Sequence, residues 1–148
     1  MNSELVLPIE IERSALLFLR EQARDAYPRE ACGVLSGIRN ENRLWIRRVF
    51  SVSNLARDSR SFDLDPGQLV ARSNEASELG EELLGVWHTH PDQRPELSDR
   101  DRHHASNEWE QVVVSVNAQS ETTIGWYGYR FGEWVATKWR EVELGSHV

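Results

Sequence analysis

The chain has 148 residues, of which 39% are hydrophobic and 28% are charged. This length suits one domain with its own core, here expected over residues 1–148, and the composition excludes an intrinsically disordered chain. The formal net charge of -7 disfavours a nucleic-acid binder, which normally presents a basic face.

Membrane insertion and secretion are also disfavoured. No run approaches the roughly 18 apolar residues of a spanning helix, and the N-terminal MNSELVLPIEIE lacks the basic start of a secretory signal. The one cysteine, Cys32, can form no disulfide within the chain. We therefore expect a cytoplasmic protein without a membrane partner. The sequence leaves the oligomeric state open, and a homodimer is compatible with it.

The first half of the chain predicts a helix followed by a β-hairpin. Residues 12–26 place apolar side chains at helical spacing, and Pro28 would end the helix. The segment 31–37 is short and apolar, and 43–52 is rich in β-forming residues, so the ENR between them is the expected hairpin turn. The polar residues 53–61 predict a loop.

The second half predicts further alternation of helices and strands. Residues 61–64 are a candidate short strand, and Asp65 followed by Pro66 is typical of a helix start, here of a helix over 66–79. The remaining expected elements are a strand at 82–89, a helix at 99–107 and an antiparallel meander of strands at 111–117, 122–130 and 133–139. The predicted fold class is α+β, a mixed, mostly antiparallel sheet packed with helices.

Residues 86–101, VWHTHPDQRPELSDRD, concentrate polar side chains that can bind a metal. On a strand, His88 and His90 point to the same face. Asp101 lies on the first turn of the helix that Ser98 begins. Two histidines and one carboxylate leave a fourth tetrahedral position to water, which is typical of catalytic zinc.

Plainer explanations exist for the same residues. Ser98 and Asp101 have the S-x-x-D spacing of a helix capping box, and an H-x-H pair can be two polar residues at a sheet edge. His103 and His104 are rival ligands, although DRDRHHASNE is more typical of a solvated helical face.

A hydrolytic zinc centre also needs a group that takes a proton from water and returns it to the leaving amine. Glu30 is the candidate, because it precedes the strand at 31–37, where a side chain can be held rigidly. The alternative is a solvated acid at a strand start. Cys32, two residues further on, is more typical of a small buried core residue.

The combination of PREACGVLSG, residues 28–37, with VWHTHPDQRPELSDRD resembles the JAMM or MPN+ metalloprotease family, also called JAB1/MPN/Mov34. The family pattern is a distant glutamate, then H-x-H, seven residues beginning with proline, a serine, two more residues and an aspartate. Every position of this pattern is filled. The resemblance implies the α/β/α-like JAB1/MPN fold, which is similar to that of cytidine deaminases, although the deaminase cysteine pair is absent.

The resemblance also implies roles. His88, His90 and Asp101 would ligate Zn²⁺. Glu30 would be the general base and acid for the activated water, and Ser98 would stabilise the tetrahedral oxyanion. The implied reaction is hydrolysis of a peptide or isopeptide bond after the C-terminal Gly-Gly of a ubiquitin-like protein. The compact length resembles that of prokaryotic members that process small sulfur-carrier proteins.

Two further expectations concern substrate and function. The loop at 53–61 and the strand at 61–64 are candidate walls of a groove for an extended tail, or else an ordinary surface loop. A non-catalytic interaction module and a RadC-like, nucleic-acid-associated domain stay open as alternatives. The intact ligand positions argue against the first, and the acidic balance argues against the second.

Overall fold

The computed structural model describes residues 7–57 and 62–143. Within them, eight strands form one sheet in the order β7-β6-β5-β4-β2-β3-β1-β8. The strands are β1 (Ile9–Glu12), β2 (Cys32–Arg39), β3 (Leu44–Val52), β4 (Glu82–Pro91), β5 (Glu110–Val116), β6 (Thr122–Arg130), β7 (Glu133–Ala136) and β8 (Arg140–Val142). The helices are α1 (Arg13–Ala26), α2 (Pro66–Glu78) and α3 (Asp99–His104).

The sheet is mixed, as the sequence predicts. Four neighbouring pairs, β2–β3, β2–β4, β5–β6 and β6–β7, are antiparallel. The pairs β1–β3, β1–β8 and β4–β5 are parallel. β4 and β5 can run parallel because the loop and helix α3 between them return the chain to the end of the sheet at which β4 begins. The predicted α+β class is confirmed.

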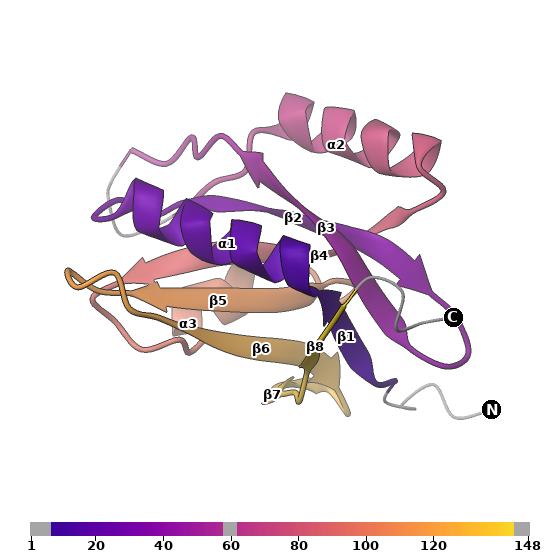
Figure 1. The fold of residues 1–148 in the computed structure, drawn as a ribbon. Coiled ribbons are helices and arrows are strands. Elements are labelled where there is room, and N and C mark those ends of the chain that lie inside the picture. Colours follow the sequence, from indigo (N-terminus) through magenta and orange to yellow (C-terminus); the bar gives the residue numbers. More distant parts are fainter. Residues whose placement is uncertain (1–6, 58–61, 144–148) are drawn as a thin grey trace.

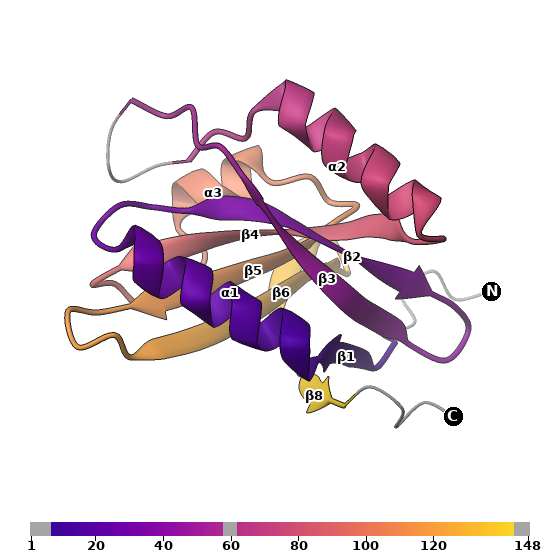
Figure 2. The same ribbon diagram turned by 45° about the horizontal axis from the view of Figure 1, so that its top comes forward.

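Helices lie on both sides of the sheet. α1 lies in front of it and α3 behind it, while α2 runs across the top (Figures 1 and 2). The larger core joins the buried side of α1, including Leu16 and Leu19, to Trp87 of β4. The smaller core, on the other face, includes Val86 and the partly buried Leu69 of α2. Among the described residues, no helix is both long and apolar enough to cross a membrane.

Two strands at one edge of the sheet, β1 and β8, are absent from the predicted elements. β1 reads IEIE, and glutamates are uncommon in buried strands. Arg43 and Arg140 form ion pairs with Glu10, and these pairs satisfy its buried carboxylate. Such partners are distant in sequence, so local patterns do not reveal the strand.

One predicted strand is not formed and two other predicted elements are shorter than expected. The expected strand at 61–64 is wrong for its described residues, which form only a single bridge between Asn54 and Leu64. Residue 61 lies outside the described residues. α3 ends at His104 rather than 107, and β7 ends at Ala136 rather than 139. The other predicted helices and strands agree with the structure within about two residues.

Candidate metal centre

Both histidines of the H-x-H pair are buried on one face of a central strand. β4 lies between β2 and β5, and His88 is 0% exposed while His90 is 6% exposed. Trp87 points to the opposite face, where its indole Nε1 donates a 3.0 Å hydrogen bond to the carbonyl of Phe50. The strand is therefore anchored on one side and presents both imidazoles on the other, which contradicts the sheet-edge alternative.

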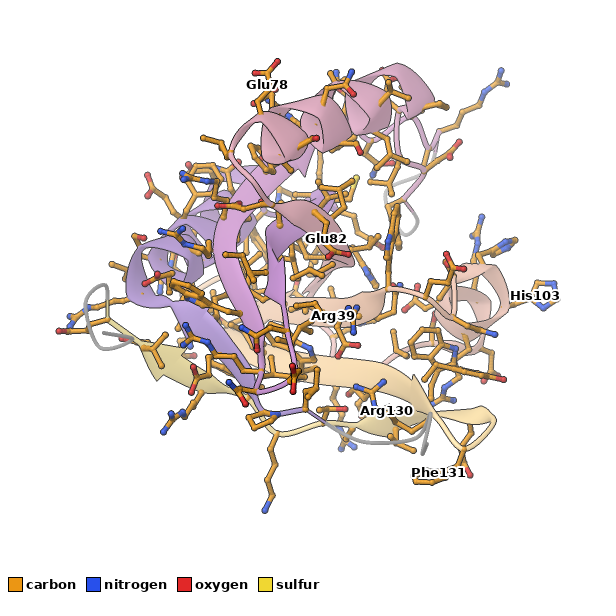
Figure 3. All side chains as sticks on the ribbon, turned by 90° about the vertical axis from the view of Figure 1, so that its right-hand side faces the viewer. Arg39, Glu78, Glu82, His103, Arg130 and Phe131 are labelled. Atoms are coloured by element: carbon orange, nitrogen blue, oxygen red, sulfur yellow. The ribbon has the colours of Figure 1, made fainter. Side chains whose placement is uncertain are left out.

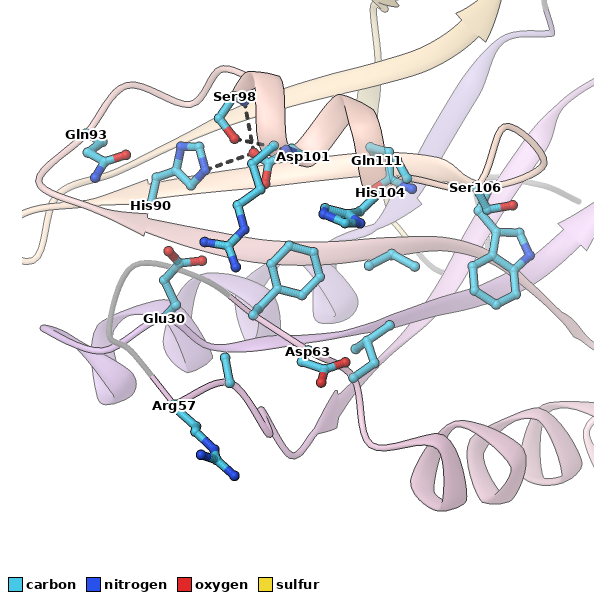
Figure 4. A pocket seen from close by; sticks show the side chains of 17 residues that line it. Glu30, Arg57, Asp63, His90, Gln93, Ser98, Asp101, His104, Ser106 and Gln111 are labelled. Carbon is cyan, nitrogen blue, oxygen red and sulfur yellow. Dashed lines mark hydrogen bonds and ion pairs between the residues drawn. The ribbon is translucent and has the colours of Figure 1, made fainter.

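Asp101 combines the two roles that the sequence presented as alternatives. The backbone N–H of Ser98 donates to Asp101 Oδ2 at 2.9 Å, and Ser98 Oγ accepts from the backbone N–H of Asp101 at 3.0 Å, which completes a capping box. The same Oδ2 atom lies 3.1 Å from His88 Nε2. It also lies 3.2 Å from His90 Nε2, a contact that is drawn in Figure 4. Capping fixes the carboxylate in the position where it meets the imidazoles.

The three side-chain atoms form a nearly equilateral triangle, because the two Nε2 atoms of His88 and His90 are themselves 3.1 Å apart. A neutral imidazole nitrogen carries either a hydrogen or a lone pair, so hydrogen bonds cannot satisfy all three contacts at once. Tetrahedral zinc, with bonds of about 2.0–2.2 Å, holds its ligand atoms about 3.3–3.5 Å apart. The donor set and its spacing therefore fit a zinc ion with three protein ligands.

The surroundings of the two imidazoles orient them. His90 Nδ1 lies 2.9 Å from the carbonyl of Arg94, so this nitrogen carries the hydrogen and Nε2 keeps its lone pair. The ring of Phe62 stacks on the ring of His88, with centroids 4.3 Å apart and an angle of 20° between the planes. Both Nε2 atoms are thereby held toward Asp101.

Electrostatics in the cluster favour a carboxylate beside a neutral imidazole. Burial lowers the pKa of His88, because it disfavours the charged ring. Burial also opposes protonation of His90, but the contact with Asp101 outweighs it and raises the His90 pKa. Burial alone would raise the pKa of Asp101, yet its close contacts with the two histidines hold that pKa well below its usual range. The charged carboxylate can therefore act as a ligand near neutral pH.

Glu30 lies in the same cavity and is buried, with 9% of its surface exposed. This contradicts the alternative of a solvated acid. The next residue, Ala31, donates its N–H to Thr89 Oγ1 at 2.8 Å and accepts from the Thr89 N–H at 3.0 Å. Because Thr89 stands between the two histidines, these bonds fix Glu30 relative to them. Figure 4 shows its carboxylate directed toward His90.

The rival ligands stay outside the centre. His103 and His104 are exposed, and Figure 3 shows His103 pointing away from the protein. Among the described His, Cys, Asp and Glu residues, the one group of three with metal-binding proximity is that of His88, His90 and Asp101. Cys32 is a buried core thiol, as expected, and burial raises its pKa to about 12.

A cavity of about 680 Å³ opens from the centre. One wall is formed by the described parts of the two segments predicted as groove walls, and residues 58–61 lie outside the described residues. The opposite wall runs from α3 to Trp109. The residues that line it are Glu30, Ala56, Arg57, Phe62, Asp63, Leu64, Val86, His90, Gln93, Ser98, Arg100, Asp101, His104, Ala105, Ser106, Trp109 and Gln111.

Residues on β6 support the metal-binding loop, although no sequence pattern predicts this role for them. The hydroxyl of Tyr127 donates a 2.7 Å hydrogen bond to the carbonyl of Pro95, midway between His90 and Ser98. A Cβ atom at Gly125 would lie only 2.0 Å from the same carbonyl oxygen, so glycine is required there. The alternation TTIGWYGYR carried the signal, but it also fits an ordinary strand.

The chain also resembles known proteins in sequence. Residues 12–127 match the model of a family described as prokaryotic homologs of the JAB domain. A Haloferax volcanii protein named desampylase is 31% identical over 135 residues, which cover 89% of this chain and 94% of that protein.

Two solved structures share the fold. A protein from Desulfitobacterium hafniense superposes with a TM-score of 0.80 at 23% identity, covering 94% of this chain and 96% of that one. A JAB1/MPN domain protein from Archaeoglobus fulgidus gives a TM-score of 0.59 at 20% identity, covering 91% and 100%.

Proposed function

The chain belongs to the prokaryotic JAB-domain family, and on that premise we propose that it is a zinc-dependent isopeptidase for a ubiquitin-like protein. The bond hydrolysed is the one after the C-terminal Gly-Gly of such a protein, small sulfur carriers included. The observation that carries the proposal is the convergence of His88, His90 and Asp101 beside the buried Glu30 in one cavity. The name of the archaeal relative, desampylase, supports the same class of reaction.

His88 and His90 would hold the metal through their Nε2 atoms, and Asp101 through Oδ2. Zinc bound there would polarise the scissile carbonyl and lower the pKa of a water molecule to about 7. The tautomer of His90 is already the one that a ligand needs, because the Arg94 carbonyl takes the Nδ1 hydrogen.

Glu30 is the proton carrier in this mechanism. Its carboxylate accepts the proton of the attacking water and delivers it to the leaving amine. Its rigid attachment beside Thr89 keeps it within reach of the reaction without making it a ligand. Its burial strengthens its electrostatic interactions there.

Ser98 would stabilise the oxyanion of the tetrahedral intermediate. Its Oγ already accepts the backbone N–H of Asp101, so its own hydroxyl hydrogen is free to point toward substrate. A donor that is held by the helix start needs no reorganisation when negative charge develops.

An extended, glycine-rich tail suits this cavity, because it brings no side chains that the cavity walls must accommodate. The segment with Phe62 and Leu64 forms one wall of the cavity and offers main-chain groups for pairing with such a tail.

The test is cleavage of a panel of ubiquitin-like proteins, each extended beyond Gly-Gly by a peptide or joined through an isopeptide bond. Mass spectrometry should find one cut after Gly-Gly in at least one member, lost with a chelator and restored by Zn²⁺. Zinc-loaded protein that cleaves no member would contradict the proposal, as would cleavage that chelation leaves unchanged. Binding of a panel member without cleavage, in protein that takes up no zinc, would favour the interaction module.

A further inference from the structure

Gln111, on β5, is a largely buried residue whose carboxamide reaches the cavity and has no protein partner among the described residues. Only 3% of its surface is exposed, and it lines the cavity of the metal centre. Its side chain makes no hydrogen bond within residues 7–57 and 62–143. A carboxamide offers two donors and one acceptor oxygen, and no protein group among the described residues uses them here. A group of this kind that faces a cavity is suited to a ligand.

The sheet register places Gln111 close to the metal centre. Val86 pairs with Gln111, and His88 pairs with Val113, on parallel strands. Because side chains alternate along a strand, Gln111 shares the face of the two metal-binding histidines. The offset of two residues corresponds to about 7 Å along the strand. In Figure 4, Gln111 lies toward His104 and Ser106, at the opposite end of the cavity from Glu30.

We propose that Gln111 is a substrate-binding residue whose carboxamide pairs with a main-chain peptide group of the tail. The inference rests on the proposed function and states how that site recognises its substrate. A Gly-Gly tail has no side chains, so recognition must use its N–H and C=O groups, and a carboxamide complements both. An extended chain advances about 3.3 Å per residue, so Gln111 reaches about two residues from the scissile bond.

The position of Glu30 selects the side of the scissile bond. Glu30 delivers a proton to the leaving amine, and Gln111 lies at the opposite end of the cavity, so Gln111 faces the acyl side. On the acyl side, the tail continues as main chain. Gln111 therefore contacts the peptide group of the penultimate glycine or of the residue before it.

The walls around Gln111 strengthen this contact. Leu64, Val86 and Trp109 line the same cavity and belong to the smaller hydrophobic core. Apolar walls keep water away from a hydrogen bond and so increase its strength.

The test replaces Gln111 by methionine, which has similar length and no hydrogen-bonding amide. With a synthetic Gly-Gly tail peptide joined to a lysine side chain, Gln111→Met should raise KM about tenfold and leave kcat within about twofold. Zinc affinity should not change. Tm should stay unchanged, because the amide makes no hydrogen bond within the described residues, whereas a structural role would lower Tm. The matched control is Gln119→Met at an exposed turn, which should alter none of these quantities.

N-methylation of the tail gives an independent test. The methyl group is placed on the backbone nitrogen of the penultimate glycine or of the residue before it. At one of these two positions it should raise the KM of the wild type about tenfold and leave the KM of Gln111→Met unchanged. The inference would be overturned if methylation raised KM equally in the wild type and in Gln111→Met at both positions, or if Gln111→Met had the KM of the wild type. Neither result would contradict the proposed isopeptidase activity.

Binding of the fluorescently labelled tail peptide to zinc-loaded protein separates the two proposals. Gln111-dependent binding without cleavage would contradict the isopeptidase and retain the tail contact. Neither binding nor cleavage at millimolar peptide would overturn both.

Discussion

Asp101 and Ser98 are joined by two reciprocal hydrogen bonds, and the carboxylate oxygen in that pair also faces both histidines. The side chain that takes part in capping the N-terminus of α3 is therefore also the one that completes the metal-binding triangle. A helix of six residues has little stability of its own, so its cap determines where the ligand lies.

Replacing Asp101 by asparagine should separate these two functions. The amide oxygen can still accept from the Ser98 N–H, but the negative charge that favours a cation is lost. We expect zinc affinity to fall at least about 100-fold, measured by competition with a chromogenic chelator. Ser98→Ala, in contrast, should lower the free energy of unfolding by about 1 kcal/mol and keep zinc. Tight zinc binding in Asp101→Asn would redirect attention to His103 and His104.

Glu30→Gln should keep the metal and lose the reaction. The ligands are unchanged, whereas the amide cannot accept the proton of water. We expect zinc content equal to that of the wild type and a decrease in kcat of at least about 100-fold on a cleaved panel substrate. Cleavage at the wild-type rate would show that another group carries the proton.

Tyr127→Phe tests whether the distant loop support matters for the metal. The variant removes only the hydroxyl that holds the Pro95 carbonyl, so zinc affinity should fall about fivefold, the equivalent of a hydrogen bond worth about 1 kcal/mol. Tyr129→Phe is the matched control, because Tyr129 lies on the same strand and packs against Trp134. Equal zinc affinities in the two variants would remove Tyr127 from the support of the centre.

Glu110 should make the free energy of unfolding depend on pH. Burial raises its pKa, although Arg130 and the indole of Trp126 oppose this. An acid whose pKa is higher in the folded state binds more protons there, so its contribution to stability decreases as pH rises above the unfolded value of about 4.3. Urea unfolding at pH 4 and pH 7 should therefore show Glu110→Gln gaining stability relative to the wild type at the higher pH. A constant difference would contradict the assigned shift.

Sequence patterns predicted much of the fold because local rules decide much of it. The cap formed by Asp65 and Pro66 begins α2 as expected, with Asp65 Oδ1 accepting from the N–H of Gly67 at 2.9 Å. Local patterns did not predict β1 or the point at which α3 ends. Glu10 becomes a strand residue only through arginines 33 and 130 positions away.

The sequence by itself determined the set of metal-binding residues, because H-x-H on a strand fixes the side on which both imidazoles project, and a capping serine fixes the start of the helix that carries Asp101. Tertiary structure alone decided that these atoms meet in a triangle, since that depends on how Tyr127 and Gly125 hold the connecting loop. It alone also revealed Gln111, which reads as an ordinary polar residue at the start of QVVVSVN. Burial and the absence of a partner within the described residues are properties of packing between distant segments, and no local pattern encodes them.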